Sequence, residues 1–396
     1  MEFQGYRRAD GSAGVRNHIL VIPASNCANE LASKIGQGVK GTLVLTHNHE
    51  CTRLKPDTER AMSTLVGIGS NPNVAGVLVV GLGCDHLPAS RIAEGIARSQ
   101  KPVEMITIEG TSGFQQALDE GWKVAREMAS QASQVRRQAC ESSQLTLGVK
   151  CTGTDTMSSL AGHRAVGKAF DAIIKSGGRA IFSETAEVIG AEHILARRAA
   201  NEKVAQRFKE FVDRFEKMIV AAGEDIRGSQ PTAGNIQGGI TTLEEKSLSA
   251  IVKTGTTPLM GVLAYAEKPQ GKGLFFMDGT AMTSQLFAGV VAAGAQILIL
   301  SVGGGLAARF RNLTAFPGWP PVAPVIKVLS NPNAAQEAEY FDVYAGGVIE
   351  GRENADEVGD RLIQEILAVA SGKPTRSDLG FSYQEPLELY ATGPLL

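Results

Sequence analysis

The segment His18–Pro23 (HILVIP) decides the fold class of this chain, because it is a short and almost uninterrupted apolar run. Similar runs occur at 42–46 (TLVLT), 74–81 (VAGVLVVG) and 103–108 (VEMITI), separated by helix-length segments at 28–36, 57–68 and 89–99. Strands that are apolar along their whole length are typical of a parallel sheet with helices on both faces. The alternation therefore predicts a doubly wound α/β unit.

The second half of the chain repeats this alternation. Strands are expected at 145–149, 179–182, 274–277, 296–300 and 325–329, and helices at 161–176, 191–222 and 285–293. A long helix over about 114–139, with Cys140 in its polar continuation, leads into the polar segment 141–144. The expected fold class is α/β with two doubly wound, mainly parallel-sheet domains. These are a Rossmann-like domain at 1–142 and a catalytic domain at 143–396. We expect loops at 232–240 and 306–324, and a tail at 375–396 that wraps over the body or a partner subunit.

Composition excludes several classes of function. The 396 residues are 43% hydrophobic and 20% charged with a formal charge of −2, so no basic face indicates a nucleic acid or an anionic membrane as partner. No apolar run reaches the roughly 20 residues of a membrane span, and the polar N-terminus is no signal peptide. We therefore expect a cytoplasmic protein. Its five cysteines contain no CxxC pair, which favours buried, catalytic or metal-bound thiols over disulfides.

Reactive residues follow the predicted strands. They occur at 25–27 (SNC), 47–51 (HNHEC), 83–86 (GCDH), 150–155 (KCTGTD), 183–187 (SETAE) and 277–279 (MDG). Ligands of open α/β sheets bind beyond the carboxyl ends of the strands. The sequence therefore predicts an active site along this edge.

Part of this set could bind a metal. His47, His49 and Cys51 offer nitrogen and sulfur donors suited to zinc or iron, although a helix-capping and a solvated histidine would give the same pattern. Cys84 and Cys151, each of which alone would more often be a buried apolar residue, could add two thiolates to Cys51. Three thiolates could hold an iron–sulfur cluster whose open iron acts as a Lewis acid on a departing hydroxyl. A mononuclear ion held by histidine and carboxylates stays an alternative.

Acidic and cationic residues indicate proton chemistry. Glu184, Glu187 and His193 are candidates for the base that removes a proton α to a carboxylate, and a solvated helix start is the alternative for the acids. Lys150, Lys246 or an arginine would anchor the substrate carboxylate.

A glycine-rich stretch at 231–239 leads into Thr241 and Thr242, either of which could cap a helix. Backbone amides there could hold a carboxylate or a sulfonate. Tight turns alone would explain this stretch and Gly303–Gly305 equally well. Neither is a GxGxxG motif with an acid downstream, so a dinucleotide site is poorly supported.

Together these motifs resemble a known family. The resemblance rests on residues 5–11 and 14–18, 47–51, 83–85, 148–155, 183–187 with 190–193, 238–247 and 324–328, in order along the chain. The sequence is similar to the large catalytic region of the altronate/galactarate dehydratase family, which also includes the β subunit of (2R)-sulfolactate sulfo-lyase. The resemblance covers most of the chain.

The resemblance implies an iron-dependent β-elimination, with Fe²⁺, a three-cysteine cluster or Mn²⁺ as cofactor. Loss of water from a sugar acid would give a 2-keto-3-deoxy acid, whereas loss of bisulfite from sulfolactate would give pyruvate. Residues implied to bind the small anionic hydroxy acid are Arg16, Asn17, Thr154, Asp155, Thr241, Thr242 and Lys246. The family's Thr-Gly-Arg-Gly loop is Val302–Gly305 here, so Arg309 or Arg311 would replace its arginine.

The family's small N-terminal domain has no counterpart in this sequence. The resemblance therefore implies a large subunit that needs a separate small subunit, in a homo-oligomer or hetero-oligomer. The alternative from another class is a non-catalytic, Rossmann-like binding subunit, which would tolerate Cys51→Ser, Cys84→Ser and Glu184→Gln.

Overall fold

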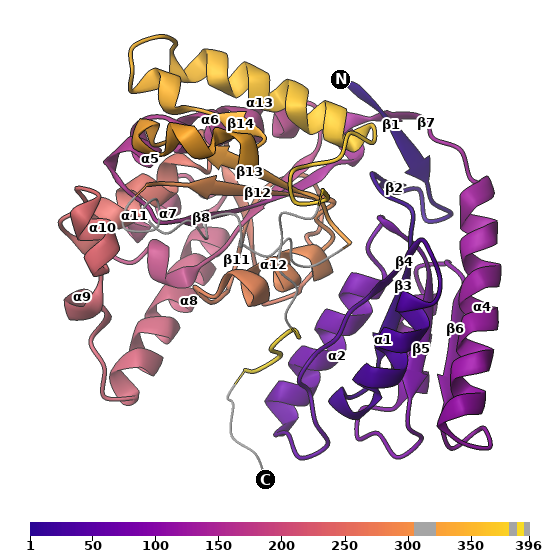
Figure 1. Ribbon diagram of the computed structural model, residues 1–396. Coiled ribbons are helices and arrows are strands. Elements are labelled where there is room, and N and C mark those ends of the chain that lie inside the picture. The colour runs from indigo at the N-terminus through magenta and orange to yellow at the C-terminus, as the bar shows by residue number, and fades with distance from the viewer. Residues whose placement is uncertain (305–321, 380–385, 392–396) are drawn as a thin grey trace.

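The computed structural model describes residues 1–304, 322–379 and 386–391. Two parallel sheets, one of four strands and one of seven, form its framework (Figure 1). The predicted α/β class with two mainly parallel sheets is confirmed.

The four-stranded sheet has the order β4-β3-β5-β6. Its strands are β3 (His18–Pro23), β4 (Thr42–Val44), β5 (Val74–Gly81) and β6 (Val103–Thr107). Its helices are α1 (Asn29–Gln37), α2 (Lys55–Gly69), α3 (Ala89–Ala97) and α4 (Phe114–Gln134). Helices α1 and α4 pack on one face of the sheet, and α2 and α3 cover the other. This is the predicted doubly wound arrangement.

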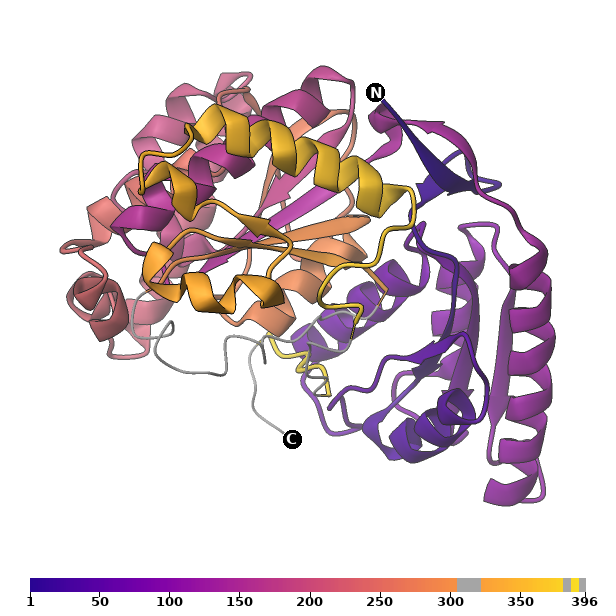
Figure 2. The same cartoon turned by 45° about the horizontal axis from the view of Figure 1, so that its top comes forward.

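The seven-stranded sheet has the order β10-β11-β9-β8-β12-β13-β14, with every pairing parallel. Its strands are β8 (Thr146–Thr152), β9 (Arg179–Phe182), β10 (Leu259–Leu263), β11 (Gly273–Met277), β12 (Ile297–Val302), β13 (Val325–Leu329) and β14 (Val343–Tyr344). Helices α6 (Gly162–Lys175) and α13 (Ala355–Ala370) cover one face, and α12 (Thr283–Ala292) lies on the other (Figure 2).

Further helices belong to this half of the chain. They are α5 (Thr156–Leu160), α7 (Glu192–Arg197), α8 (Glu202–Ala221), α9 (Ile226–Ser229), α10 (Ala233–Gln237) and α11 (Leu243–Val252). Short 3₁₀ turns are η1 (Asn26–Ala28), η2 (Ser142–Gln144), η3 (Thr185–Glu187) and η7 (Gly346–Val348), and a longer, kinked 3₁₀ segment is η6 (Pro332–Tyr340). None of the helices in the described part of the chain is long and apolar enough to cross a membrane.

Strand β8 lies at a topological switch point. It has β9 on one side and β12 on the other, so the chain leaves β8 in one direction and later returns on the opposite side. The carboxyl ends of β8 and β12 therefore lie side by side at the switch point, which is where open α/β sheets bind ligands. This topology directs attention to residues 150–155 and 303–304.

A third, antiparallel sheet was not expected from the sequence. It has the order β2-β1-β7 and consists of β1 (Glu2–Arg7), β2 (Ala13–Gly14) and β7 (Gln138–Glu141). The prediction that Cys140 continues a helix is wrong, because Cys140 pairs with Phe3 in this sheet and is buried. A remote strand supplies its hydrogen bonds, and a local pattern cannot reveal such a partner.

Two further predictions need correction. The helix expected at 191–222 is broken between α7 and α8, where backbone bonds join Arg198 and Ala200 to Leu259 of β10 and Asn201 starts a new helix as its cap. The loop expected at 232–240 contains α10, which Thr232 caps. Most of the predicted loop at 306–324 lies outside the described residues, and so does Arg311.

The two parallel sheets share one apolar layer. Helix α2 packs against α12, and a Cβ added at Gly67 would lie 2.6 Å from the carbonyl oxygen of Ala292. Beside this layer, buried Asn73 accepts from Val15 N and donates to the carbonyl oxygens of Gln296 and Val322, at 2.8, 2.8 and 2.9 Å. One amide thus satisfies backbone groups from both halves of the chain.

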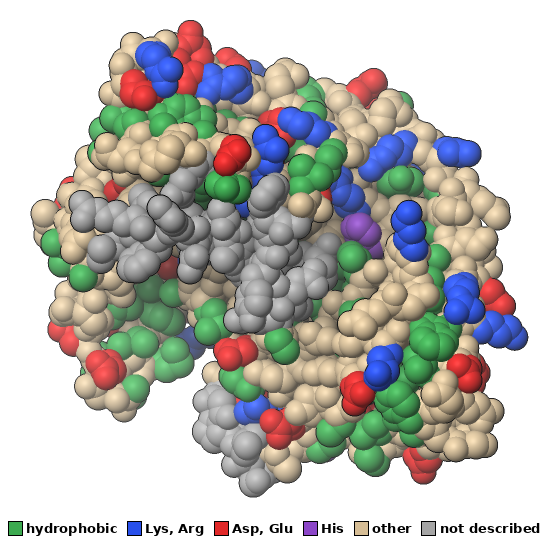
Figure 3. Space-filling model, in the orientation of Figure 1, with side chains coloured by type: hydrophobic (Ala, Val, Ile, Leu, Met, Phe, Trp, Pro, Cys, Tyr) green, Lys and Arg blue, Asp and Glu red, His purple; other side chains and the backbone are tan. Residues whose placement is uncertain are grey.

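The predicted wrapping of the tail over the body is confirmed for residues 386–391. Leu387 N donates to Thr46 O at 2.8 Å, and Tyr390 OH accepts from Arg53 at 2.8 Å. On the molecular face in Figure 3, cationic and anionic side chains are interspersed, in keeping with the net charge of −2.

Asn73→Ala should lower the free energy of unfolding by about 2–4 kcal/mol, because buried backbone groups lose their partners. Urea unfolding measures this change. Gln115→Ala on the exposed face of α4 is the control and should change stability by less than about 0.5 kcal/mol. Equal effects of the two substitutions would contradict the role of Asn73.

Candidate active site

A buried ion pair lies at the carboxyl end of the seven-stranded sheet. Lys150 is in β8, and its Nζ lies 2.5 Å from Glu184 Oε2 in the loop after β9. Both side chains are almost fully buried. The predicted base Glu184 and the predicted carboxylate anchor Lys150 are therefore in direct contact.

A second buried pair lies beside the first. Lys253 follows α11, and its Nζ lies 2.5 Å from Glu187 Oε2 and 2.9 Å from Cys151 Sγ. The Cys151 thiol also lies 3.1 Å from Glu187 Oε1. Successive residues of a strand point to opposite faces, so Lys150 and Cys151 lie on different sides of β8. The loop 184–187 gives one carboxylate to each side.

Burial and charge act in opposite directions on these groups. Burial penalises the charged form of Glu187, but Lys253 and Lys150 outweigh it and lower the pKa to about 2. Burial and the neighbouring Glu187 raise the pKa of Glu184 above that of an ordinary glutamate.

Burial alone would lower the pKa of Lys150, but Glu184 and Glu187 raise it instead. Burial and Glu187 raise the pKa of Cys151 to about 11, so the thiol is neutral at pH 7. The site thus contains ammonium groups, one firmly ionised carboxylate and one carboxylate with increased proton affinity.

The backbone at Glu184 is strained. Its φ of 78° lies in the region that favours glycine, at a cost of about 1–3 kcal/mol for other residues. Such conformations persist where the surroundings fix them, and they cluster at functional sites. The strain supports a functional role for Glu184 independently of its charge.

Thr154 and Asp155 organise the switch point. Asp155 Oδ2 accepts from Gly304 N at 2.6 Å and from Asn331 Nδ2 at 3.2 Å, and its other oxygen caps α5. Thr154 Oγ1 lies 3.4 Å from Cys151 Sγ. Asp155 therefore joins the loops after β8, β12 and β13, and its oxygens already have partners within the chain.

Other predicted substrate residues lie in structural contacts. Arg16 forms a salt bridge with Asp378 at 2.8 Å and also donates to backbone carbonyl oxygens. Asn17 accepts a hydrogen bond from Arg8 and donates one to Ala132 O. Of the two predicted caps, Thr242 caps α11.

Thr241 donates to Glu245, and Lys246 donates to Gln230 at 3.0 Å. Arg309 lies outside the described residues.

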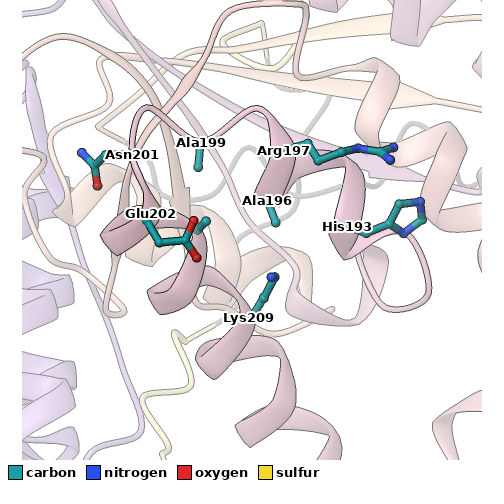
Figure 4. A pocket seen from close by; sticks show the side chains of 8 residues that line it. His193, Ala196, Arg197, Ala199, Asn201, Glu202 and Lys209 are labelled. Atoms are coloured by element: carbon teal, nitrogen blue, oxygen red, sulfur yellow. The ribbon is translucent and has the colours of Figure 1, made fainter.

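The predicted base His193 is separate from the buried pairs. It is exposed on α7 beside an open cavity of about 400 Å³, which Arg197, Asn201, Glu202 and Lys209 also line (Figure 4). Its exposure contrasts with the burial of Glu184 and Glu187, so the structure does not bring the three predicted bases together.

The predicted metal ligands are divided between the sheets. Cys51 and Cys84 are exposed at the four-stranded sheet, whereas Cys151 is buried against Lys253 and Glu187. In the parts of the chain that the structure describes, no three His, Cys, Asp or Glu side chains are arranged to hold a metal ion. The donors present therefore do not fit a three-thiolate site.

The two motif histidines differ. One nitrogen of His47 lies 2.7 Å from Pro23 O and the other accepts from His49 N at 3.2 Å, so its ring is fully engaged. Among the described residues, neither ring nitrogen of His49 has a hydrogen-bond partner, and both are buried. His49 is thus the motif donor that has capacity for a ligand.

Sequence reasoning missed Lys253 and His163. His163 Nδ1 lies 2.9 Å from Ser249 O in α11, one turn before Lys253. His163 is fully buried, and burial together with Lys253 lowers its pKa to about 4, so the ring is neutral. No motif marks either residue, because packing of α11 against α6 and the turn η3 brings them to Glu187.

The fold and site define a class: a two-sheet α/β enzyme with paired lysines and glutamates at a topological switch point. The family model for the D-galactarate/altronate dehydratase C-terminal region matches residues 142–390, and the model for the second domain of D-galactarate dehydratase/altronate hydrolase matches residues 5–133. The chain belongs to this family, and it is a lyase.

Individual relatives span nearly the whole chain. It is 36% identical to (2R)-sulfolactate sulfo-lyase subunit beta of Chromohalobacter salexigens over 95% of this chain and 94% of that protein. It is 31% identical to altronate dehydratase of Bacillus subtilis, over 94% and 74% of the two chains. It is 30% identical to galactarate dehydratase (L-threo-forming) of Escherichia coli, over 94% and 73%.

Lys253→Met should destabilise the protein in a pH-dependent way. The pKa of Glu187 is about 2 in the folded chain against 4.5 for an ordinary glutamate, so its stabilising contribution is present above pH 4.5 and is lost as the pH falls towards 2. Without Lys253, Glu187 loses its closest partner and ionises at a cost, so the effect grows with pH. We expect a loss of about 3–5 kcal/mol at pH 7 and a smaller loss at pH 4, measured by urea unfolding.

The double variant Lys253→Met with Glu187→Gln is the control. It removes the unpaired charge and should recover part of the stability at pH 7. An equal loss for Lys253→Met at both pH values would contradict the electrostatic origin.

Proposed function

We propose that this chain catalyses β-elimination of water from a sugar acid or related hydroxy acid, giving a 2-keto-3-deoxy acid. The observation that carries the proposal is the buried contact between Glu184 and Lys150 at the switch point, with Glu184 in a strained backbone conformation. A carboxylate with raised pKa beside an ammonium group suits proton abstraction α to a carboxylate.

In the proposed reaction Glu184 takes the proton from C2 of the substrate. Lys150 stabilises the negative charge that develops on the substrate carboxylate, as a preorganised cation at a site from which water is excluded. Glu184 then passes this proton to the hydroxyl that leaves C3 as water, so C2–H and C3–O break and a C2–C3 double bond forms. The resulting enol tautomerises to the 2-keto acid, and Lys253 and Glu187 form the buried ion pair on the other side of β8.

A second candidate is loss of bisulfite from (2R)-sulfolactate to give pyruvate. The 36% identity to a sulfo-lyase β subunit, over 94% of that protein, favours it. Proton removal from C2 would be the same, and only the group leaving C3 would differ. Because that relative is a β subunit, we also propose a separate small subunit as a partner of this chain.

The activity assay should include altronate, galactarate and sulfolactate, with 2-keto acid and sulfite measured in parallel. Keto acid without sulfite supports the dehydratase, and equal amounts of both support the sulfo-lyase. Glu184→Gln should lower kcat by a factor of about 10²–10⁴, because the amide cannot accept the proton. Wild-type rates in this variant would exclude Glu184 as the base.

Iron stays a proposed cofactor, and we propose that any iron in this chain is held without Cys151. Support comes from the contacts of the Cys151 thiol with Lys253 and Glu187 and from the unfilled ring nitrogens of His49. Iron and acid-labile sulfide should be measured after anaerobic purification. Cys151→Ser should leave both unchanged, whereas His49→Ala should reduce any bound iron. Loss of iron and sulfide in Cys151→Ser would instead support the three-cysteine cluster.

A further inference from the structure

The loop after β11 lies against the loop that carries Glu184. Strands β11 and β9 pair in parallel, with Phe276 beside Phe182, so Asp278 and Gly279 continue next to residues 183–185. The two backbones approach so closely that a Cβ added at Gly279 would lie 2.1 Å from Ser183 Oγ. This close approach allows direct bonds between the loops.

Thr185 makes these bonds. Its Oγ1 donates to Asp278 Oδ1 at 2.7 Å and accepts from Gly279 N at 3.3 Å, and its backbone N donates to Gly279 O at 3.1 Å. The side chain is fully buried, so water does not compete for these contacts. We call Thr185, Asp278 and Gly279 the Thr185 clamp.

Asp278 is itself held in place. Its second oxygen, Oδ2, accepts from Arg214 of α8 at 2.5 Å. The carboxylate therefore has one oxygen on the buried hydroxyl and the other on a guanidinium group at the surface. This arrangement limits rotation of the Asp278 side chain.

The clamp acts on the residue directly after the strained Glu184. A non-glycine residue at φ 78° returns to a relaxed conformation unless its neighbours fix it. With Thr185 fixed, Glu184 cannot relax, and its carboxylate remains 2.5 Å from Lys150 Nζ.

We propose that Thr185 and Asp278 are positioning residues that hold Glu184 in its strained conformation and thereby aim its carboxylate at the substrate. The proposal rests on the role of Glu184 in the proposed function.

Thr185→Val removes the hydroxyl with little change of shape, and Thr185→Ser retains it. Because small misplacement of a reacting group is costly, we expect Thr185→Val to lower kcat about 10- to 100-fold with little change in KM. Thr185→Ser should restore most of kcat. With substrate deuterated at C2, the isotope effect on kcat should increase in Thr185→Val, because proton abstraction limits the rate more strongly.

A purely structural role of Thr185 would give a different result. Fewer folded molecules would lower kcat while leaving KM and the isotope effect unchanged. Asp278→Ala should resemble Thr185→Val. Glu267→Ala is its matched control, because Glu267 pairs with Arg207 of the same helix at 3.4 Å without contacting the Glu184 loop in the described residues. That control should keep wild-type kcat.

A second measurement needs no substrate. Glu184→Gly should melt at a higher temperature than Glu184→Ala, because glycine adopts positive φ without strain. In a Thr185→Val background this difference should shrink, because the backbone at position 184 is then free to relax. An unchanged difference overturns the proposal.

The two measurements separate the two hypotheses. If the wild type releases no product from any of the tested acids, the proposed function fails, and the melting temperatures still decide whether the clamp exists. If the wild type is active and Thr185→Val keeps its kcat and isotope effect, the positioning role is wrong while the proposed function stands.

Discussion

The structure of the site depends on placing charged groups where water cannot reach them. Each ion moved into a protein interior costs several kcal/mol, and only close pairing in good geometry offsets this cost. Lys150 with Glu184 and Lys253 with Glu187 meet this condition, with 2.5 Å contacts on the two sides of β8. The loop after β9 must therefore place two carboxylates three residues apart around the edge of the sheet. A 3₁₀ turn preceded by a residue of positive φ achieves this.

The remaining architecture keeps that edge rigid. Asp155 joins the loops on both sides of the switch point, His163 holds α11, and the apolar layer between the sheets leaves α2 and α12 in close contact. Rigid support matters because the pairs are strong only at short range. A shift of one ångström would leave buried charges poorly compensated, and that is more costly than the loss of an exposed salt bridge.

Sequence reasoning succeeded where the signal is local and failed where a distant partner decides. The apolar run at 18–23 is a strand whose type follows from its own residues, and Thr242, one of the two predicted caps, caps α11. Cys140, in contrast, is in a strand because β1 pairs with it from more than 130 residues away. The break between α7 and α8 has the same origin, since pairing with β10 interrupts an otherwise helical pattern.

The sequence by itself determined the α/β class, the family and the candidate roles of Lys150, Glu184 and Glu187, because strand patterns and motifs are written in neighbouring residues. Only the tertiary structure decided which of these residues meet. It brought Lys253 to Glu187 and Cys151, placed Arg16 in a structural contact and left His193 exposed. The physical reason is that pairing of buried charges requires contact within a few ångströms. Contacts between remote segments arise from the packing of helices on the sheets and leave no periodic trace in the chain.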